Sequence, residues 1–87
     1  MPYIPQEQRD VLDPFIRDLF LQIQLRPGVA GQCNYVVTQL LVALFVRSPS
    51  YASLNAAIGV LECAKLELYR RQVAPYEDTK IVENGDI

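Results

Sequence analysis

Apolar residues recur along this chain at spacings of three and four, the period of α-helices that each hide one face. The first such helix is expected from Pro14 to about Leu25, after a short helical turn over residues 6–12. Asp13 followed by Pro14 is a typical helix start, with a capping carboxylate and a proline at the first position. The residues expected to form the buried stripe of this helix are Leu12, Phe15, Ile16, Leu19, Phe20 and Ile23.

Two further helices follow. The second is expected over Gly31–Val46, and apolar side chains cover more than half of its circumference, which is typical of a central helix. The third is expected to begin after a cap at Ser50 or Ser53, with a helical pattern that continues until Pro75 interrupts it. Only about four residues join these two helices, so we expect an antiparallel hairpin.

The two ends of the chain are expected to be extended. Pro2 and Pro5 predict an N-terminal arm over residues 1–5, and the β-like triplet Lys80–Val82 predicts an extended tail over residues 79–87. Together these elements predict one all-α domain over residues 1–87, a small three-helix bundle in which the first helix packs across the hairpin.

The composition predicts self-association. The chain has 87 residues, of which 51% are hydrophobic. A domain of this size has too little interior to hide such a fraction, so apolar surface is left for a partner. A second copy of the chain is the simplest partner, and we expect a homodimer.

Charge and residue types exclude several classes of function. The net charge is −2 and no basic face is visible, so no nucleic-acid partner is expected. The absence of histidine excludes imidazole metal sites and histidine-dependent catalysis, and no cofactor motif occurs. Cys33 and Cys63 are expected to be reduced core residues, and without a secretory leader the expected compartment is the cytoplasm.

The uncharged stretch Pro27–Val46 approaches the length of a membrane span. It contains several polar residues and a proline, and its unbroken apolar run covers only Leu40–Val46. A helix covered by protein explains this composition better, so no membrane partner is expected.

A thin polar line marks the third helix. Asn55, Glu62 and Tyr69 recur at heptad spacing between apolar neighbours, which predicts half-buried groups in need of hydrogen-bond partners. Facing residues on the second helix are Asn34, Tyr35 and Thr38. The favoured interpretation is a buried polar network that fixes helix register and dimer geometry; a small-molecule pocket and a fully solvated line are the alternatives.

A charged segment follows on the same helix. Glu67 precedes Arg70 and Arg71 at the spacings of helical ion pairs, which is typical of a solvated face. As a functional alternative, this segment contacts an acidic protein partner through Lys65, Glu67, Arg70, Arg71 and Tyr76. Glu62 and Glu67 are also weak metal-ligand candidates, but about 140° of helix separates them, so a shared ion requires a second chain.

Several strings of residues resemble a small uncharacterised protein family seen in phage genomes and in marine and environmental sequences. They are Asn34–Thr38, Leu54–Asn55, Ile58–Glu67, Tyr69–Asp78 and the tail from Lys80 to Asp86. The resemblance implies a cytoplasmic accessory protein expressed from a phage or phage-derived region. It implies no activity, and it groups Glu62, Tyr69, Arg70, Arg71 and Tyr76 on one surface.

The function predicted from these observations is that of a homodimeric helical scaffold, an accessory protein that binds another protein and catalyses nothing. The alternative is a small carboxylate-dependent, divalent-metal hydrolase that is active as an oligomer.

Overall fold

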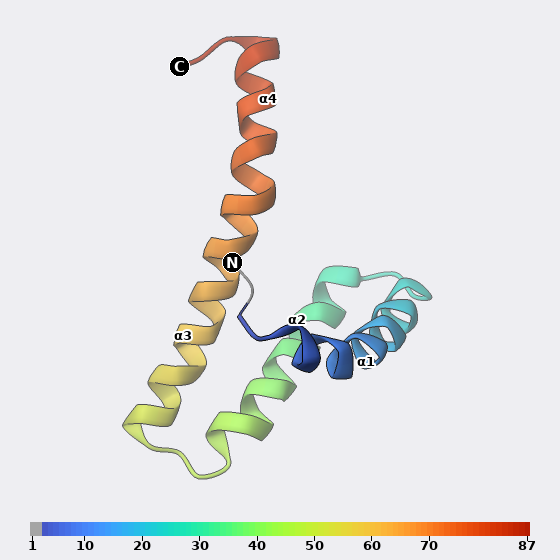
Figure 1. Ribbon diagram of the computed structural model, residues 1–87, viewed down its shortest axis with the longest axis vertical. Coiled ribbons are helices and arrows are strands. Elements are labelled where there is room, and N and C mark those ends of the chain that lie inside the picture. The colour runs from blue at the N-terminus through green and yellow to red at the C-terminus, as the bar shows by residue number, and fades with distance from the viewer. Residues whose placement is uncertain (1–2) are drawn as a thin grey trace. The chain divides into compact units, whose positions relative to one another are not determined.

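The computed structural model describes residues 3–87, and within that range the chain is helical with no strand (Figure 1). The all-α fold class is confirmed. Two of the elements, η1 and η2, are single π-helical turns that continue the α-helices before them. The elements are α1 (Gln6–Gln24), α2 (Val29–Leu41), η1 (Val42–Val46), α3 (Tyr51–Leu68), η2 (Tyr69–Val73) and α4 (Ala74–Asn84).

Contacts group the chain into two compact units, residues 1–40 and residues 41–87. The first contains α1 and nearly all of α2, and the second contains η1, α3, η2 and α4. The single domain and the packing of the first helix across the hairpin therefore stay predictions.

The predicted break near Asp13 is wrong, because α1 runs through Pro14 without interruption. The helix begins instead after Pro5, whose backbone is extended at φ −63° and ψ 162°. Pro14 deletes one backbone hydrogen bond but leaves the remaining ladder intact on both sides. One apolar stripe continues across the local start signal from Leu12 to Phe15, and its period outweighs that signal.

The turn after α1 is tied down by one side chain of α2. Gly28 takes φ +80°, a left-handed conformation that favours glycine. The side-chain amide of Gln32 donates to the backbone carbonyl oxygens of Pro27 at 3.1 Å, Ile23 at 3.3 Å and Arg26 at 3.4 Å. These carbonyls belong to the end of α1 and its exit, where intrahelical donors run out. The second helix consequently starts at Val29, two residues before the predicted start at Gly31.

Ser50 and Ser53 cap α3 together, so the predicted cap is confirmed. The Ser53 backbone N–H donates to the Ser50 side-chain oxygen at 3.0 Å, and the Ser50 backbone N–H donates to the Ser53 side chain at 2.9 Å. Each bond satisfies a donor that the first turn of a helix leaves without an intrahelical partner.

The predicted extended tail is also wrong. Residues 79–84 belong to α4, and only residues 85–87 follow the helix, which ends at Gly85 with φ +84°. Pro75 lies in the first turn of α4, directly after the helical residue Val73, so its missing N–H falls within a continuous helical stretch. The π-helical turn η2 directly before it changes the bonding pattern there, and α3, η2 and α4 follow one another without a turn between them (Figure 1).

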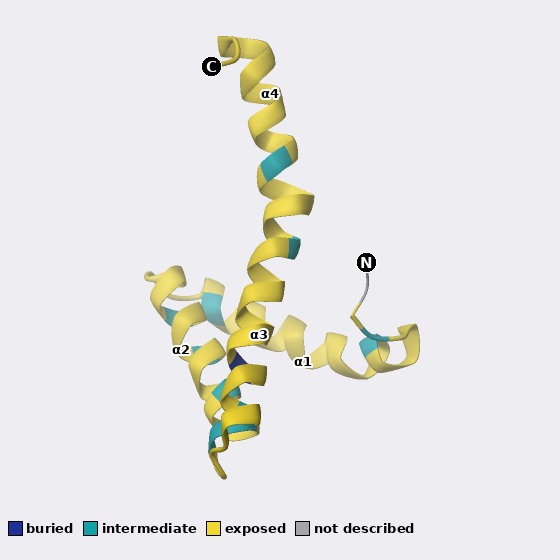
Figure 2. Ribbon diagram, turned by 90° about the vertical axis from the view of Figure 1, so that its left-hand side faces the viewer, coloured by how far each residue is buried: buried dark blue, intermediate teal, exposed yellow. Residues whose placement is uncertain are grey.

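Very little of the chain is buried. Among residues 3–87, Ala57 of α3 is the one residue classed as buried, with 7% of its surface exposed (Figure 2). The apolar faces that the sequence predicted as buried remain open, including most of the α1 stripe and Leu40 and Leu44 beyond it. The predicted burial of the two cysteines is wrong as well, because Cys33 and Cys63 are both exposed.

Candidate functional site

An apolar groove lies between α1 and α2 in the first unit. It has a volume of about 420 Å³ and no charged side chain lines it. The C-terminal half of α1 contributes one wall and the first turns of α2 the other. The residues that line this α1–α2 groove are Ile16, Leu19, Phe20, Ile23, Gln24, Val29 and Cys33.

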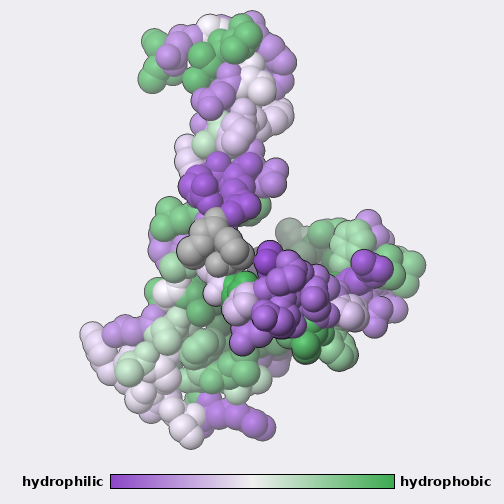
Figure 3. Space-filling model, viewed as in Figure 1, coloured by the Kyte–Doolittle hydropathy of each residue, from purple (hydrophilic) through white to green (hydrophobic). Residues whose placement is uncertain are grey.

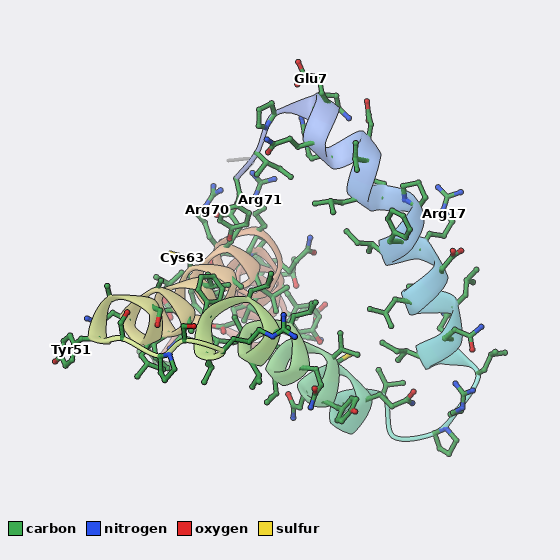
Figure 4. All side chains as sticks on the ribbon, turned by 90° about the horizontal axis from the view of Figure 1, so that it is seen from below. Glu7, Arg17, Tyr51, Cys63, Arg70 and Arg71 are labelled. Carbon is green, nitrogen blue, oxygen red and sulfur yellow. The ribbon has the colours of Figure 1, made fainter. Side chains whose placement is uncertain are left out.

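The apolar stripe of α1 continues beyond the groove toward the N-terminus of the helix. Phe15 is 70% exposed and Leu12 is 47% exposed, and neither lines the groove. Arg17 points to the opposite side of α1, away from α2 (Figure 4). Because successive stripe residues lie one turn apart, α1 presents a continuous apolar surface of which α2 covers only one end.

The second unit has its apolar centre where η1 meets α3. These two elements pack against each other; Phe45 and Val46 of η1 are half-buried, and Ala57 of α3 is buried. Hydrophobic residues gather over the lower part of this unit in the space-filling view (Figure 3). The side chains of Leu54 and Leu61 on α3 stay more than two-fifths exposed, so this packing covers only part of the face.

Three charged side chains form an ion-pair cluster, Glu67, Arg70 and Arg71, at the junction of α3 and η2 (Figure 4). Arg70 Nη2 lies 2.7 Å from Glu67 Oε1, and Arg71 Nε donates to the same oxygen. The Arg71 guanidinium, with a smaller contribution from Arg70, lowers the pKa of Glu67 from its ordinary value of 4.5 to about 2. The predicted pairing of Glu67 with both arginines is confirmed.

Other predicted partner-contact residues lie on the neighbouring turns. Lys65 pairs with Glu62 at 3.2 Å on α3, and the Lys80 ammonium lies 5.5 Å from the centre of the Tyr76 ring on α4. All four of these side chains are exposed. Exposed ion pairs of this kind contribute little to stability, so their charges remain accessible to a partner.

The polar line on α3 is not half-buried within one chain, contrary to expectation. Asn55 is exposed, the Glu62 side chain is 55% exposed and Tyr69 is 49% exposed. On the helical stretch of the other unit, Asn34, Tyr35 and Thr38 are exposed as well. A role of these six residues at an interface between chains stays a prediction.

The two carboxylates proposed as metal ligands, Glu62 and Glu67, form separate ion pairs. Glu62 pairs with Lys65 and Glu67 with the two arginines, each within its own turn of helix. Among residues 3–87, no group of three or more histidine, cysteine or acidic side chains lies close enough together to hold a metal ion. The part of one chain that the structure describes therefore offers no ligand set for a divalent-metal hydrolase.

Comparison with known proteins gives one finding. A family model described as a domain of unknown function (DUF6899) matches residues 1–87. The chain belongs to this DUF6899 family. No curated protein and no solved structure matches it. The resemblance to a small uncharacterised family is thus confirmed at the level of the family, and the match extends over the whole length of the chain.

In this DUF6899 chain, Val29–Val46 is long and apolar enough to cross a membrane by length and composition alone, with a mean hydropathy of 1.6. A signal sequence near an N-terminus passes the same criterion, and so does the core helix of a soluble protein, but such a core helix is mostly buried and none of Val29–Val46 is buried here. Gln32 lies inside this stretch, and its amide binds carbonyls at the end of α1, including that of the charged Arg26. This contact ties the start of the stretch to a polar turn.

The α1–α2 groove does not follow from the sequence pattern. That pattern assigns its α1 residues to a buried stripe and places Val29 outside the second helix. The signal that points to the groove is the glycine before Val29. Gly28 takes the left-handed conformation that lets α2 begin at once and bring Val29 and Cys33 beside α1.

Proposed function

We propose that this chain is a homodimeric helical scaffold, an interaction protein that catalyses no reaction and presents a surface to another protein. The observation that carries the proposal is how little of the described chain is buried. Within residues 3–87 only Ala57 is buried, while the aromatic and aliphatic residues of α1 stay open. An apolar surface of this extent is typical of a protein–protein contact site.

Helix energetics support a partner chain. Helices in proteins, including one of 19 residues such as α1, owe most of their stability to the packing of an amphipathic face rather than to helix propensity. Ordering the side chains and backbone of such a helix costs conformational entropy that exposed residues do not offset. A second copy presents the same stripe and is available wherever the chain itself is made.

A charged surface on α3, η2 and α4 fits the role of partner contact. Lys65, Arg70 and Arg71 project cationic groups from consecutive turns, and Tyr76 follows on α4. Glu67 holds both arginines in place, which reduces the side-chain entropy that binding would cost. An acidic segment of a protein is the partner that this surface would attract. A cytoplasmic accessory role is part of this proposal.

The test is a mass measurement by light scattering behind size exclusion, in detergent-free buffer, with and without millimolar Mg²⁺ or Mn²⁺. The expected result is a metal-insensitive particle of twice 9.9 kDa. A monomer would contradict the proposal, because the open apolar surfaces would then lack an occupant. A mass that changes with the metal would favour the hydrolase alternative, and a chain recovered only with detergent would favour a membrane location for Val29–Val46.

A further inference from the structure

We infer that two copies of this chain associate through the apolar stripe of α1, with the N-terminal half of one stripe seated in the α1–α2 groove of the other copy. This inference rests on the proposed homodimer and adds which surface forms it. The stripe comprises Leu12, Phe15, Ile16, Leu19, Phe20 and Ile23, and the groove adds Val29 and Cys33 to its C-terminal half.

The shape of the first unit is self-complementary. At one end of the stripe the side chains line a hollow of about 420 Å³. At the other end Leu12 and Phe15 line no hollow and are exposed, Phe15 more so at 70%. A two-fold axis between Arg17 and Asp18, with the two α1 helices antiparallel, brings the N-terminal end of each stripe over the other copy's hollow.

That axis sets a register. Leu12 of one copy lies opposite Ile23 of the other, Phe15 opposite Phe20, and Ile16 opposite Leu19, so every pair is apolar. The contact is isologous and closed, because the N-terminal end of each stripe occupies the groove of the other copy. The charged side of α1, where Arg17 points away from α2, stays in water (Figure 4).

The available area is close to what a stable dimer needs. Residues 12, 15, 16, 19 and 20 are between 39% and 70% exposed. At about 150–250 Å² for each large side chain, they present on the order of 600 Å² of apolar surface per copy. A specific interface buries about 800 Å² per partner, and the groove residues not yet counted, Ile23, Val29 and Cys33, add to this area. The α1 stripe with its groove thus suffices for the contact without any other element.

Cysteine cross-linking tests the register, because Cys33 already lies in the groove. Leu12→Cys is introduced in a background with Cys63→Ser, and Arg17→Cys in the same background is the matched control on the outer side of α1. Air or copper-phenanthroline oxidation is followed by non-reducing electrophoresis. We expect the thiol introduced by Leu12→Cys to form a disulfide with Cys33 of the other copy. This bond should form about ten-fold faster than any dimer of the control, as proximity raises the effective thiol concentration.

The outcomes separate the inference from the proposed function. A two-chain mass by light scattering with equal cross-linking of both variants would overturn the inference and leave the homodimer standing. A monomeric mass would overturn both. A disulfide between the introduced thiol and Cys33 within one chain, seen as a faster-migrating monomer, would also overturn the inference.

A second pair of variants covers the case in which Leu12→Cys does not fold. Phe15→Asp places a charge in the proposed contact, and Ile58→Asp places one at a similarly exposed apolar position of α3, where Ile58 is 66% exposed. We expect Phe15→Asp to give a monomeric mass and Ile58→Asp to keep the mass of two chains. The reverse pattern would overturn the inference.

Discussion

The side-chain amide of Gln32 donates to the carbonyl oxygen of Pro27 at 3.1 Å and, by its further contacts with Ile23 and Arg26, closes the end of α1 from the first turn of α2. Three carbonyl oxygens at the end of α1 share one donor group, and that of Ile23 also accepts from the Arg26 backbone N–H at 3.4 Å. This contact links the first turn of α2 to the end of α1.

We expect Gln32→Ala to lower the free energy of unfolding by about 1 kcal/mol, because the turn loses its side-chain hydrogen bonds. Gln39→Ala on the same helix is the control, since Gln39 is exposed and a surface substitution of this kind changes stability by about 0.5 kcal/mol or less. Urea unfolding followed by circular dichroism measures both. Equal midpoints for the two variants would show that the Gln32 contacts do not hold the turn.

Alanine substitutions at the two glycines of the first unit, Gly28 and Gly31, should change stability in opposite directions. Gly28 has φ +80°, so Gly28→Ala should destabilise the chain by about 1 kcal/mol through backbone strain. Gly31 is within α2, and a Cβ there meets no atom within 4 Å. Gly31→Ala should therefore stabilise by about 0.5–1 kcal/mol through helix propensity. Thermal melts at one protein concentration compare the two, and a stabilised Gly28→Ala would refute the left-handed turn.

Ser50→Ala should lower the free energy of unfolding more than Ser53→Ala does. Ser50→Ala loses the oxygen that accepts the Ser53 N–H, and we expect a loss of about 1 kcal/mol. Ser53→Ala keeps that acceptor and should cost less, while Ser48→Ala, outside the helix, should melt like the wild type. If Ser50→Ala also melts like the wild type, the reciprocal cap does not determine where α3 begins.

The ion-pair cluster predicts a stability change in acid. The pKa of Glu67 is about 2 in the folded chain against an ordinary 4.5, so its ion pairs are fully present above pH 4.5 and are lost as the pH falls toward 2. Glu67→Gln should make unfolding less dependent on pH in that window, whereas Lys65→Gln, which leaves Glu67 intact, should retain the wild-type dependence. Urea midpoints between about pH 6 and pH 2 measure this. A wild-type acid dependence in Glu67→Gln would contradict the lowered pKa.

The helices could be predicted from apolar periodicity, but the points where they begin and end could not. Pro14 and Pro75 both resemble breaks, yet the structure accommodates each within a helical segment. At Pro14 the apolar stripe on both sides outweighs one lost hydrogen bond, and at Pro75 the π-helical turn η2 directly before the proline changes the hydrogen-bonding pattern. By contrast, the cap that Ser50 and Ser53 form at the start of α3 was predictable, because such a cap depends on two residues three positions apart.

The candidate site was predictable only in part. The pairing of Glu67 with Arg70 and Arg71 follows from helix geometry alone. The exposure of Glu62 and Tyr69 does not, since a pattern of apolar neighbours predicts burial without saying whether the same chain or another provides the cover. The apolar excess of the composition was the more informative signal.

The measurement that tests the account most directly is the unfolding of the wild-type chain by urea over a wide range of protein concentrations. If two chains fold and associate together, each tenfold increase in concentration should raise the free energy of unfolding per dimer by about 1.4 kcal/mol and move the midpoint to higher urea. We expect that shift. A midpoint that stays the same at every concentration would contradict it, because the open face of α1 would then need no second copy.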